Sequence, residues 1–539
     1  MKAVSIFNHV LGPVMRGPSS SHTAGAFHIG SMARSMLGGT PAKAVLRFDP
    51  AGSYAATYEP QGADRGFAMG LMARPLTDEC FFTALRDARD AGLELRFAVE
   101  ALADADHPNT TDLDLTAADG RRLHLVARSV GGGAVEIVKI DGREALFDGS
   151  AHEVLIETAA AAEQVEAALI ETGGMMSPLE SRKGPDCVRF TMRRRTVLSD
   201  FERDVIRGAA DGVRIWESAP VYFVAQGEPL FDSAAELVAI AEERGVGLGD
   251  VALAHEAQLL GMTEREVIEE MLRRYDVMAA SVERGLDPEF TGLQLLPSCA
   301  GSIFQAEAAG KLSVRSLHTR AAARALAVMH VDGAMGVVCA APTGGSAGVI
   351  PGTLVTLAEE RSLSREEIAK ALLAAGAIGM ILAVRGTFAA EVAGCQVEIG
   401  ASGAMAAAAV VDAVGGSARQ ACDAAAISFQ NTMGTVCDLL HGMVEIPCHT
   451  RNGAAAANAF VNADLILGGY TNYIPLDETI DAVYAVGQAM PSELRCTSKG
   501  GLAVTPSALG LTPGCCGSGC STCGQTVQPR TDAKKTECG

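Results

Sequence analysis

The sequence predicts a multidomain fold: an N-terminal α/β (α+β) domain, a small module of the ferredoxin-fold type and an all-α C-terminal domain. Three observations carry this prediction. The chain has 539 residues, which is too long for a single hydrophobic core. Strand and helix patterns alternate up to residue 226, and the pattern is helical beyond Phe231. The C-terminal segment is rich in cysteine and glycine. We therefore place the domains at residues 1–150, 151–226 and 227–510, followed by a cysteine-rich tail at 511–539.

The first domain combines an amphipathic helix with alternating segments. Apolar residues at helical spacing predict a helix over residues 24–37. Alternation of apolar and polar residues predicts four strands, the second and third of them a pair, at residues 43–49, 93–99, 123–129 and 134–140.

The middle segment has the order of elements of a βαββαβ module. Its apolar patterns predict strands and helices at residues 154–157 (strand), 159–171 (helix), 187–193 (strand), 200–209 (helix), 213–216 (strand) and 221–225 (strand).

The last domain shows helix starts followed by Ala- and Gly-rich apolar runs. Ser233, Thr263 and Ser364 are each followed three residues later by Glu, the pattern of a capping box. The longest uncharged apolar run covers residues 371–384. A membrane-spanning helix needs roughly 20 such residues, so this run predicts a buried core helix.

Composition narrows the classes of function. The formal net charge of −20 argues against nonspecific nucleic-acid binding and against attraction to anionic membranes. The apolar stretch at residues 4–14 is interrupted by Asn8 and His9, unlike a secretory signal. Fourteen cysteines in such a chain favour metal binding or catalysis over disulfides. We expect a cytoplasmic protein without nucleic-acid or membrane partners, and a homodimer because isologous dimers are the commonest oligomers.

Two polar loops stand out as candidate binding segments. GPSSSHT, at residues 17–23, places four hydroxyls and an imidazole before a helix, where free N–H groups and hydroxyls suit a carboxylate. Its other interpretation is a helix N-cap with spare serines. CAAPTGGSAGVIPG, at residues 339–352, exposes backbone N–H groups that suit an anion, although a plain interhelical loop would have the same spacing.

Two further segments contain cysteines beside glycine-rich turns. EVAGCQVEIGASGAM centres on Cys395, and NTMGTVCDLLHGMVEIPCHTRNG contains Cys437, Cys448 and Arg451. Taken singly, such cysteines are more often small buried apolar residues than ligands. Together, three cysteines can hold a [4Fe–4S] cluster and leave one iron open, and an open iron is a Lewis acid.

These motifs resemble those of the iron–sulfur-dependent L-serine dehydratases (L-serine ammonia-lyases). The resemblance covers residues 1–510 and has the order of a single-chain form that fuses the family's β and α parts. It rests on five motifs in the family's order: GPSSSHT, APTGGSAGVIPG, AGCQVEIG, CDLLHGMVEIPCHTRNG and TSKGGLA.

The resemblance implies a [4Fe–4S] cluster on Cys395, Cys437 and Cys448. In some family members a terminal cysteine caps the open iron until substrate displaces it. Cys515 or Cys516 would fill that role here. A separate zinc site in the tail, or a tail without a metal role, remain alternatives.

The resemblance also implies a small amino-acid substrate held between the two domains. His22 is the expected general base, with Ser21 as the alternative. Arg451 would pair with the substrate carboxylate, unless it forms a structural ion pair. The residues expected to contact substrate are Ser19, Ser20, Ser21, His22, Thr23, Thr343, Gly344, Gly345, Arg451 and Asn452.

Several related functions stay open at this point. The same cluster would serve an L-cysteine desulfidase or an L-threonine deaminase. A pyridoxal-phosphate lyase needs a Schiff-base lysine, and residues 227–515 contain only Lys311, Lys370 and Lys499, none in a recognisable setting. The middle module resembles an ACT-type regulatory domain, so a ligand-binding regulatory role and a structural role are both possible. An amino-acid-binding regulatory protein is the remotest alternative, because it leaves the three cysteines without a role.

Overall fold

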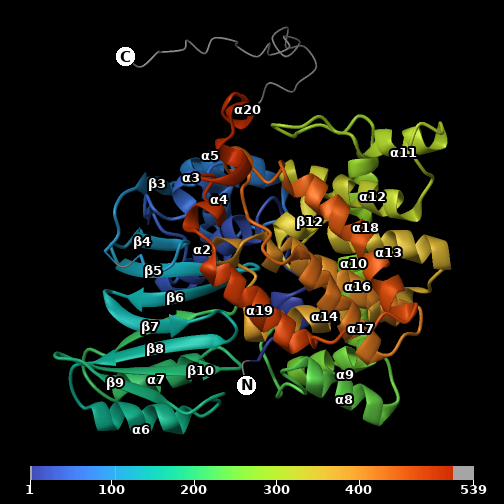
Figure 1. Ribbon diagram of the computed structural model, residues 1–539. Helices are drawn as coiled ribbons and strands as arrows, with labels where there is room; N and C mark the ends of the chain where they lie inside the picture. Colours follow the sequence, from blue (N-terminus) through green and yellow to red (C-terminus); the bar gives the residue numbers. More distant parts are fainter. Residues whose placement is uncertain (1–2, 104, 514–539) are drawn as a thin grey trace, which may run out of the picture.

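In the computed structural model, which describes residues 3–103 and 105–513, two sheets with their covering helices lie on one side and a helical domain lies on the other (Figure 1). The strands between residues 43 and 218 form two sheets along one side. The helices between residues 234 and 509 fill the other side. The structure therefore confirms a multidomain chain with an N-terminal α/β region and a helical C-terminal part.

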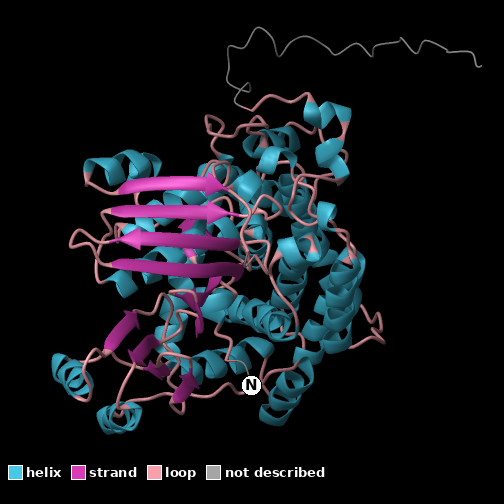
Figure 2. Ribbon diagram, turned by 90° about the vertical axis from the view of Figure 1, so that its left-hand side faces the viewer, coloured by secondary structure: helices cyan, strands magenta, loops and turns pink. Residues whose placement is uncertain are grey.

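The larger sheet has six strands and is mixed (Figure 2). Its edge strand β3 runs parallel to β2, and all other neighbours are antiparallel. In sheet order the strands are β3 (Glu94–Val99), β2 (Lys43–Phe48), β4 (Thr110–Thr116), β5 (Arg122–Gly131), β6 (Ala134–Ile140) and β7 (Arg143–Phe147). Buried residues of two helices share one apolar core with this sheet, α2 (Gly25–Leu37) and α4 (Ala63–Leu71). Two shorter helices accompany them, α3 (Tyr54–Thr57) and α5 (Ala84–Asp90).

Alternation of residues predicts β2, β3, β5 and β6, and the structure confirms these four strands. Strands β4 and β7 were not predicted. In β4 the sequence contains two aspartates, which are disfavoured in strands. Asp112 and Asp114 of β4 nonetheless fit the sheet, because both pair with Arg47 on the adjacent strand β2. The predicted pairing of residues 93–99 with 123–129 is wrong, because β2 and β4 lie between those strands.

The middle module has the order βαββαβ and an antiparallel sheet ordered β11-β8-β10-β9. This is the strand order of a split βαβ unit. Its elements are β8 (His152–Thr158), α6 (Ala162–Thr172), β9 (Glu180–Lys183), β10 (Val188–Arg194), α7 (Asp200–Gly208) and β11 (Arg214–Ser218).

Two predictions for this module differ from the structure. The strand expected at residues 221–225 is wrong, because that segment is irregular. Its side chains and backbone bond elsewhere: Tyr222 donates to the carbonyl of Gly133, and the N–H of Phe223 donates to Asn8. The sheet takes β9 instead, which the pattern misses because all four of its residues are exposed and polar.

The C-terminal domain is a pack of helices whose buried surface is mostly Ala, Leu and Val. Thr263 and Ser364 form complete capping boxes at two of their starts, and Ser233 caps a third. The helices are α8 (Ala234–Arg244), α9 (Leu248–Leu260), α10 (Glu264–Leu286), α11 (Ala300–Ala308), α12 (Leu317–Gly333), α13 (Val349–Arg361), α14 (Arg365–Arg385), α15 (Ala390–Ala393), α16 (Ile399–Ala413), α17 (Ala418–Thr432), α18 (Cys448–Leu467), α19 (Leu476–Ala489) and α20 (Pro506–Leu509).

Helix α14 contains the long apolar run. Among the described residues it alone is long and apolar enough to cross a membrane by length and composition. However, 83% of its most apolar window is buried inside the protein. It packs against α9 and α16, so the prediction of a core helix is confirmed.

The N-terminal segment joins the two halves of the molecule. Helix α1 (Ile6–His9) packs into the core of the helical domain, with Glu256 of α9 accepting hydrogen bonds from its first residues. Strand β1 (Val14–Arg16) then pairs with β12 (Val337–Cys339), a short strand within the helical half that the pattern does not predict. Because the GPSSSHT loop follows β1 directly, this pairing places the loop at the boundary between the domains.

Candidate active site

The GPSSSHT loop leads from β1 into a π-helical turn (Ser20–Ala24) that continues as α2. Ser19 caps this turn, because its Oγ accepts a hydrogen bond from the N–H of His22 at 3.1 Å. Thr23 donates from Oγ1 to the carbonyl of Gln61 at 2.6 Å, so it braces the loop. Ser20 is buried and its Oγ has no hydrogen-bond partner within the described protein. Ser19 thus serves as the cap, and the hydroxyl of Ser20 remains available to bind.

The His22 imidazole is fully buried between both domains. Nε2 lies 3.1 Å from Ser53 Oγ, and Nδ1 lies 3.0 Å from Ser19 Oγ and 3.5 Å from a carboxylate oxygen of Glu391. The ring of Tyr54 meets the imidazole edge-on at 4.9 Å between centroids. Burial lowers the pKa of His22 to about 3, so the ring is neutral near pH 7.

Two glutamates complete this region, the buried Glu391 and the partly exposed Glu398, and sequence reasoning did not assign either of them a role. Burial raises the pKa of Glu391, opposed by hydrogen bonds from Asn109 and Ser21. One of its carboxylate oxygens, Oε2, has no hydrogen-bond partner within the described protein. Burial, with the nearby charge of Glu391, raises the pKa of Glu398 to about 8. The sequence contained a signal that could have identified these two residues, because both glutamates flank Cys395 within an apolar Ala- and Gly-rich stretch.

The loop of Thr343, Gly344 and Gly345 contacts the GPSSSHT loop directly. A Cβ at Gly344 would lie 2.9 Å from the carbonyl oxygen of Pro18 and 3.0 Å from the amide nitrogen of Ser20, so only glycine permits this approach. A Cβ at Gly345 would lie 3.8 Å from Glu398 Oε2. Thr343 is buried and also hydrogen bonds to Glu398. These two loops, which are distant in sequence, therefore form one wall of the site.

The three cysteines predicted as ligands gather behind this wall. Cys395 and Cys437 form a thiol–thiol hydrogen bond, and with Glu398 their ligand atoms all lie within 4.8 Å of one another. Cys448 begins α18, where burial and then the charges of Cys395 and Glu398 raise the pKa of its thiol. All three are buried and none forms a disulfide. Cys515 and Cys516 lie outside the described residues.

A fourth cysteine, absent from the predicted set, lies beside Cys437. The Cys496 thiol hydrogen bonds with that of Cys437 and is 6% exposed. Its carbonyl oxygen accepts a hydrogen bond from Ser53 Oγ at 3.1 Å, so it also touches the α/β domain. The signal that could have drawn attention to Cys496 is its place directly before the TSKGGLA motif, whereas its contact with Ser53, 443 positions away, is visible only in the fold.

Arg451 and Asn452 are held by the protein itself. Arg451 pairs with Asp438 at 3.0 Å and donates to the carbonyl of Val436 at 2.8 Å. The predicted pairing of Arg451 with a substrate carboxylate stays a prediction. The charge of Arg451 also lowers the pKa of Cys448, against the larger effect of burial. The Asn452 amide donates to the carbonyls of Gly345 and Cys448, both at 2.9 Å, and accepts from a backbone N–H of the same loop. These bonds brace the loop that carries Gly345, and a substrate contact of Asn452 stays a prediction.

The donor set fits a thiophilic metal centre. Buried thiols beside carboxyl groups are costly to ionise unless a cation balances their charge. Thiolates are ligands for iron–sulfur clusters and zinc, and metal binding would stabilise their ionised form. The donors that meet here come from three segments and are Cys395, Glu398, Cys437, Cys448 and Cys496.

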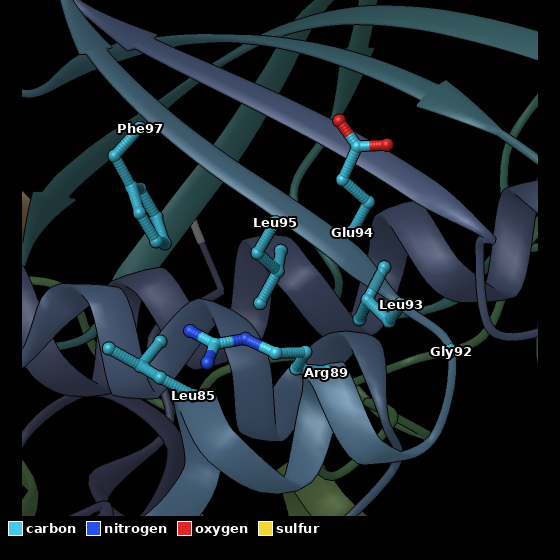
Figure 3. Close-up of a pocket in the computed structure, with 7 residues that line it drawn as sticks. All are labelled: Leu85, Arg89, Gly92, Leu93, Glu94, Leu95 and Phe97. Atoms are coloured by element: carbon cyan, nitrogen blue, oxygen red, sulfur yellow. The ribbon is translucent and has the colours of Figure 1, made fainter.

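A separate surface pocket of about 510 Å³ lies between α5 and the edge strand β3 (Figure 3). Leu85, Leu93, Leu95 and Phe97 supply most of its lining. Its acidic residue, Glu94, points away from Arg89 in Figure 3 and pairs with Lys43. This pocket lacks the grouped thiols and carboxyls of the domain boundary, so the candidate site is at the boundary.

Some known proteins match only the helical C-terminal part of the chain, and another matches nearly the whole chain. The family model described as serine dehydratase alpha chain matches residues 232–503, half of the chain. A probable L-serine dehydratase alpha chain from Bacillus subtilis is 39% identical over 278 residues, or 52% of this chain and 93% of the relative. L-serine dehydratase 1 from Escherichia coli is 32% identical over 281 residues, or 51% of this chain and 62% of the relative. The L-serine dehydratase from Streptomyces coelicolor is 27% identical over 515 residues, or 93% of this chain and 99% of the relative. The chain therefore belongs to the serine dehydratase family, in its single-chain form.

Proposed function

We propose that this protein is an L-serine ammonia-lyase that converts L-serine to pyruvate and ammonia. Its cofactor would be a [4Fe–4S] cluster bound by Cys395, Cys437 and Cys448. The observation that carries the proposal is that His22 faces Glu391, while Glu398 of the same segment is grouped with the thiols of Cys395 and Cys437. The names of the relatives, L-serine dehydratases, support the same reaction.

The zwitterionic substrate matches the unpaired polar groups of the site. Its ammonium group suits the carboxyl oxygens of Glu391 and Glu398, because Oε2 of Glu391 is unpaired and a nearby cation would favour the ionised form of both groups. Its carboxylate suits the unpaired hydroxyl of Ser20 and the turn that follows it. When bound, the cluster supplies a Lewis-acidic iron that weakens the bond to the departing hydroxyl.

The hydrogen bonds around His22 favour one tautomer. Ser53 donates its single hydroxyl proton to the carbonyl of Cys496, so its oxygen accepts from Nε2–H of His22. Nδ1 then carries the lone pair of the ring, which accepts a hydrogen bond from the Ser19 hydroxyl at 3.0 Å, and it lies 3.5 Å from Glu391. We infer that Nδ1 accepts the proton from the substrate Cα. Ser21, the alternative base, acts in this geometry through its hydrogen bond to Glu391.

The neutral state of His22 supports this role. A base must be unprotonated before it can act, and burial keeps the pKa of His22 near 3. As the proton arrives, the Glu391 carboxylate at 3.5 Å would stabilise the imidazolium that forms. Dehydration yields aminoacrylate, which tautomerises and hydrolyses in water to pyruvate and ammonia.

Turnover of three amino acids tests the proposal. Anaerobically purified full-length protein is incubated with L-serine, L-threonine or L-cysteine, and pyruvate, 2-oxobutyrate, ammonia and sulfide are measured. We expect equal amounts of pyruvate and ammonia from L-serine, with the highest kcat/KM of the three. Faster release of sulfide from L-cysteine would replace the proposal with a desulfidase, and preference for L-threonine would replace it with a threonine deaminase.

A further inference from the structure

Cys496 is the one described cysteine outside the predicted ligand set whose thiol meets a member of that set. The Cys437 thiol hydrogen bonds on one side with Cys395 and on the other with Cys496. Two other buried cysteines provide a contrast. Cys339 and Cys422 lie in the helical core, and no thiol contributes to the pKa of either of them. Burial alone therefore does not bring thiols together in this protein.

The backbone holds Cys496 at this place. Its N–H donates to the carbonyl of Cys437 at 3.0 Å, and the N–H of Cys437 donates to the carbonyl of Leu494 at 2.8 Å. Cys496 also has φ = 60°, a left-handed conformation that non-glycine residues seldom adopt and that costs free energy. Ser53 fixes its carbonyl oxygen from the opposite domain. Three hydrogen bonds thus fix the backbone at and beside Cys496, in addition to the packing of its side chain in the helical core.

We propose that Cys496 supplies a fourth thiolate to the metal centre of the substrate-free enzyme, an inference that rests on the proposed cluster. Its Sγ loses a proton and forms one metal–sulfur bond, without any transfer of electrons. The corner left open by Cys395, Cys437 and Cys448 is then closed until an oxygen of the substrate replaces Cys496. In this scheme the tail residues Cys515 and Cys516 are not needed as ligands.

Mild oxidation distinguishes three thiolates from four. A [4Fe–4S] cluster with an iron that lacks a protein ligand readily loses that iron to give a [3Fe–4S] cluster, whereas four thiolates retain it. The anaerobic full-length holoenzyme, without substrate, is treated with ferricyanide. Released iron is measured with a chelator, and the [3Fe–4S] cluster is measured by electron paramagnetic resonance. The proteins compared are wild type, Cys496→Ala, Cys422→Ala as the matched buried control, and a double variant carrying Cys515→Ala and Cys516→Ala.

We expect wild type, Cys422→Ala and the tail double variant to retain their iron. Cys496→Ala should release about one quarter of its iron, one atom of four, and show the [3Fe–4S] signal. Cys496→Ser keeps the side-chain volume and should also release iron faster than wild type, which covers the case in which the alanine variant fails to fold.

Three results would overturn the inference while leaving the proposed function intact. Wild type could lose iron as readily as Cys496→Ala, both Cys496 variants could retain iron as wild type does, or the tail double variant alone could release it. Purified wild type without iron and acid-labile sulfide would instead overturn the proposed cofactor, and the inference with it.

Discussion

Glu256 and Glu391 are both buried glutamates whose pKa is raised by burial, yet they differ in their hydrogen bonds. Glu256 accepts from Ser5 Oγ and from two backbone N–H groups, which anchor the N-terminal helix. Glu391 has an oxygen without a partner and faces His22 at a distance longer than a hydrogen bond. The first carboxyl is saturated by the protein, whereas the second retains capacity to bind something else.

The same difference separates the buried histidines and cysteines. His255 bonds only to backbone groups and packs on Phe231, whereas His22 faces hydroxyls and a carboxyl. Cys422 and Cys437 both lie in the helical core, but only Cys437 touches two other thiols. Burial by itself thus does not identify the site. Grouped and incompletely bonded polar residues do, and in this molecule they meet at the boundary between the domains.

The largest difference is expected between two cysteine variants. Cys437→Ala removes the central thiol of the group, so we expect loss of both iron and serine turnover, since each remaining thiolate then lacks its neighbour. Cys422→Ala should keep both. Iron analysis and pyruvate assays on anaerobically purified proteins provide the comparison. Equal iron content in the two variants would remove Cys437 from the ligand set.

The next largest difference concerns the histidines. His22→Asn should keep the iron and slow kcat by roughly 10²–10⁴-fold, because the variant lacks a general base. His255→Asn, the matched variant, should lower thermal stability but leave kcat close to that of wild type. Full turnover by His22→Asn would assign proton abstraction to another residue.

A smaller effect on turnover is expected at Glu391. Glu391→Gln keeps the volume of the side chain but loses the charge that stabilises imidazolium, so kcat should fall by roughly 10–10²-fold. Because Glu391 acts through His22, the variant should change kcat more than KM and alter the pH profile of kcat. An unchanged pH profile together with a lower melting temperature would indicate a structural role only.

Glu256 should respond in the opposite way. Glu256→Ala leaves buried donors of the N-terminal segment unpaired, so the free energy of unfolding should fall by about 3–5 kcal/mol. Glu256→Gln keeps one acceptor and should lose less. Denaturant titration measures the change, and kcat of the folded fraction should stay the same. A large loss of kcat in a stable Glu256 variant would contradict the purely structural role assigned to Glu256.

The smallest effect is a dependence of stability on pH. Burial lowers the pKa of His255 to about 4, below the ordinary value of about 6.5 in the unfolded chain. A lowered pKa gives stability that is complete above pH 6.5 and is lost as the pH falls toward 4, by at most about 1.4 kcal/mol per pH unit. Gln does not titrate, so the stability of His255→Gln should not fall in this way. The difference in free energy of unfolding between wild type and the variant should therefore shrink by about 1 kcal/mol between pH 7.5 and 5.5. Unfolding curves at both pH values test this, and a constant deficit would contradict it.

Much of the fold could be predicted because its signals are local. Alternation identified four strands of the large sheet, and capping patterns identified helix starts at Thr263 and Ser364. Strand β9 gave no signal because its residues are exposed and polar. The neighbours of β3 and β5 in the sheet could not be read either, because pairing depends on contacts between segments that no local pattern records.

The candidate site divides in the same way. The segments around Cys395, Cys437 and Cys448 could be recognised as motifs, and the structure brings these cysteines together. Cys496 and Ser53 carry no motif, and their contact joins residues 443 positions apart. Arg451 shows the limit for a single residue, because only the folded chain reveals that Asp438 already pairs with it.

Dependence of turnover on iron tests the central claim most directly. Full-length protein is purified anaerobically, stripped of metal with a chelator, and then reconstituted with iron and sulfide. Pyruvate release from L-serine is measured at each stage. The account predicts turnover that disappears with the iron and returns in proportion to the iron restored. Undiminished release of pyruvate by the metal-free protein would contradict it.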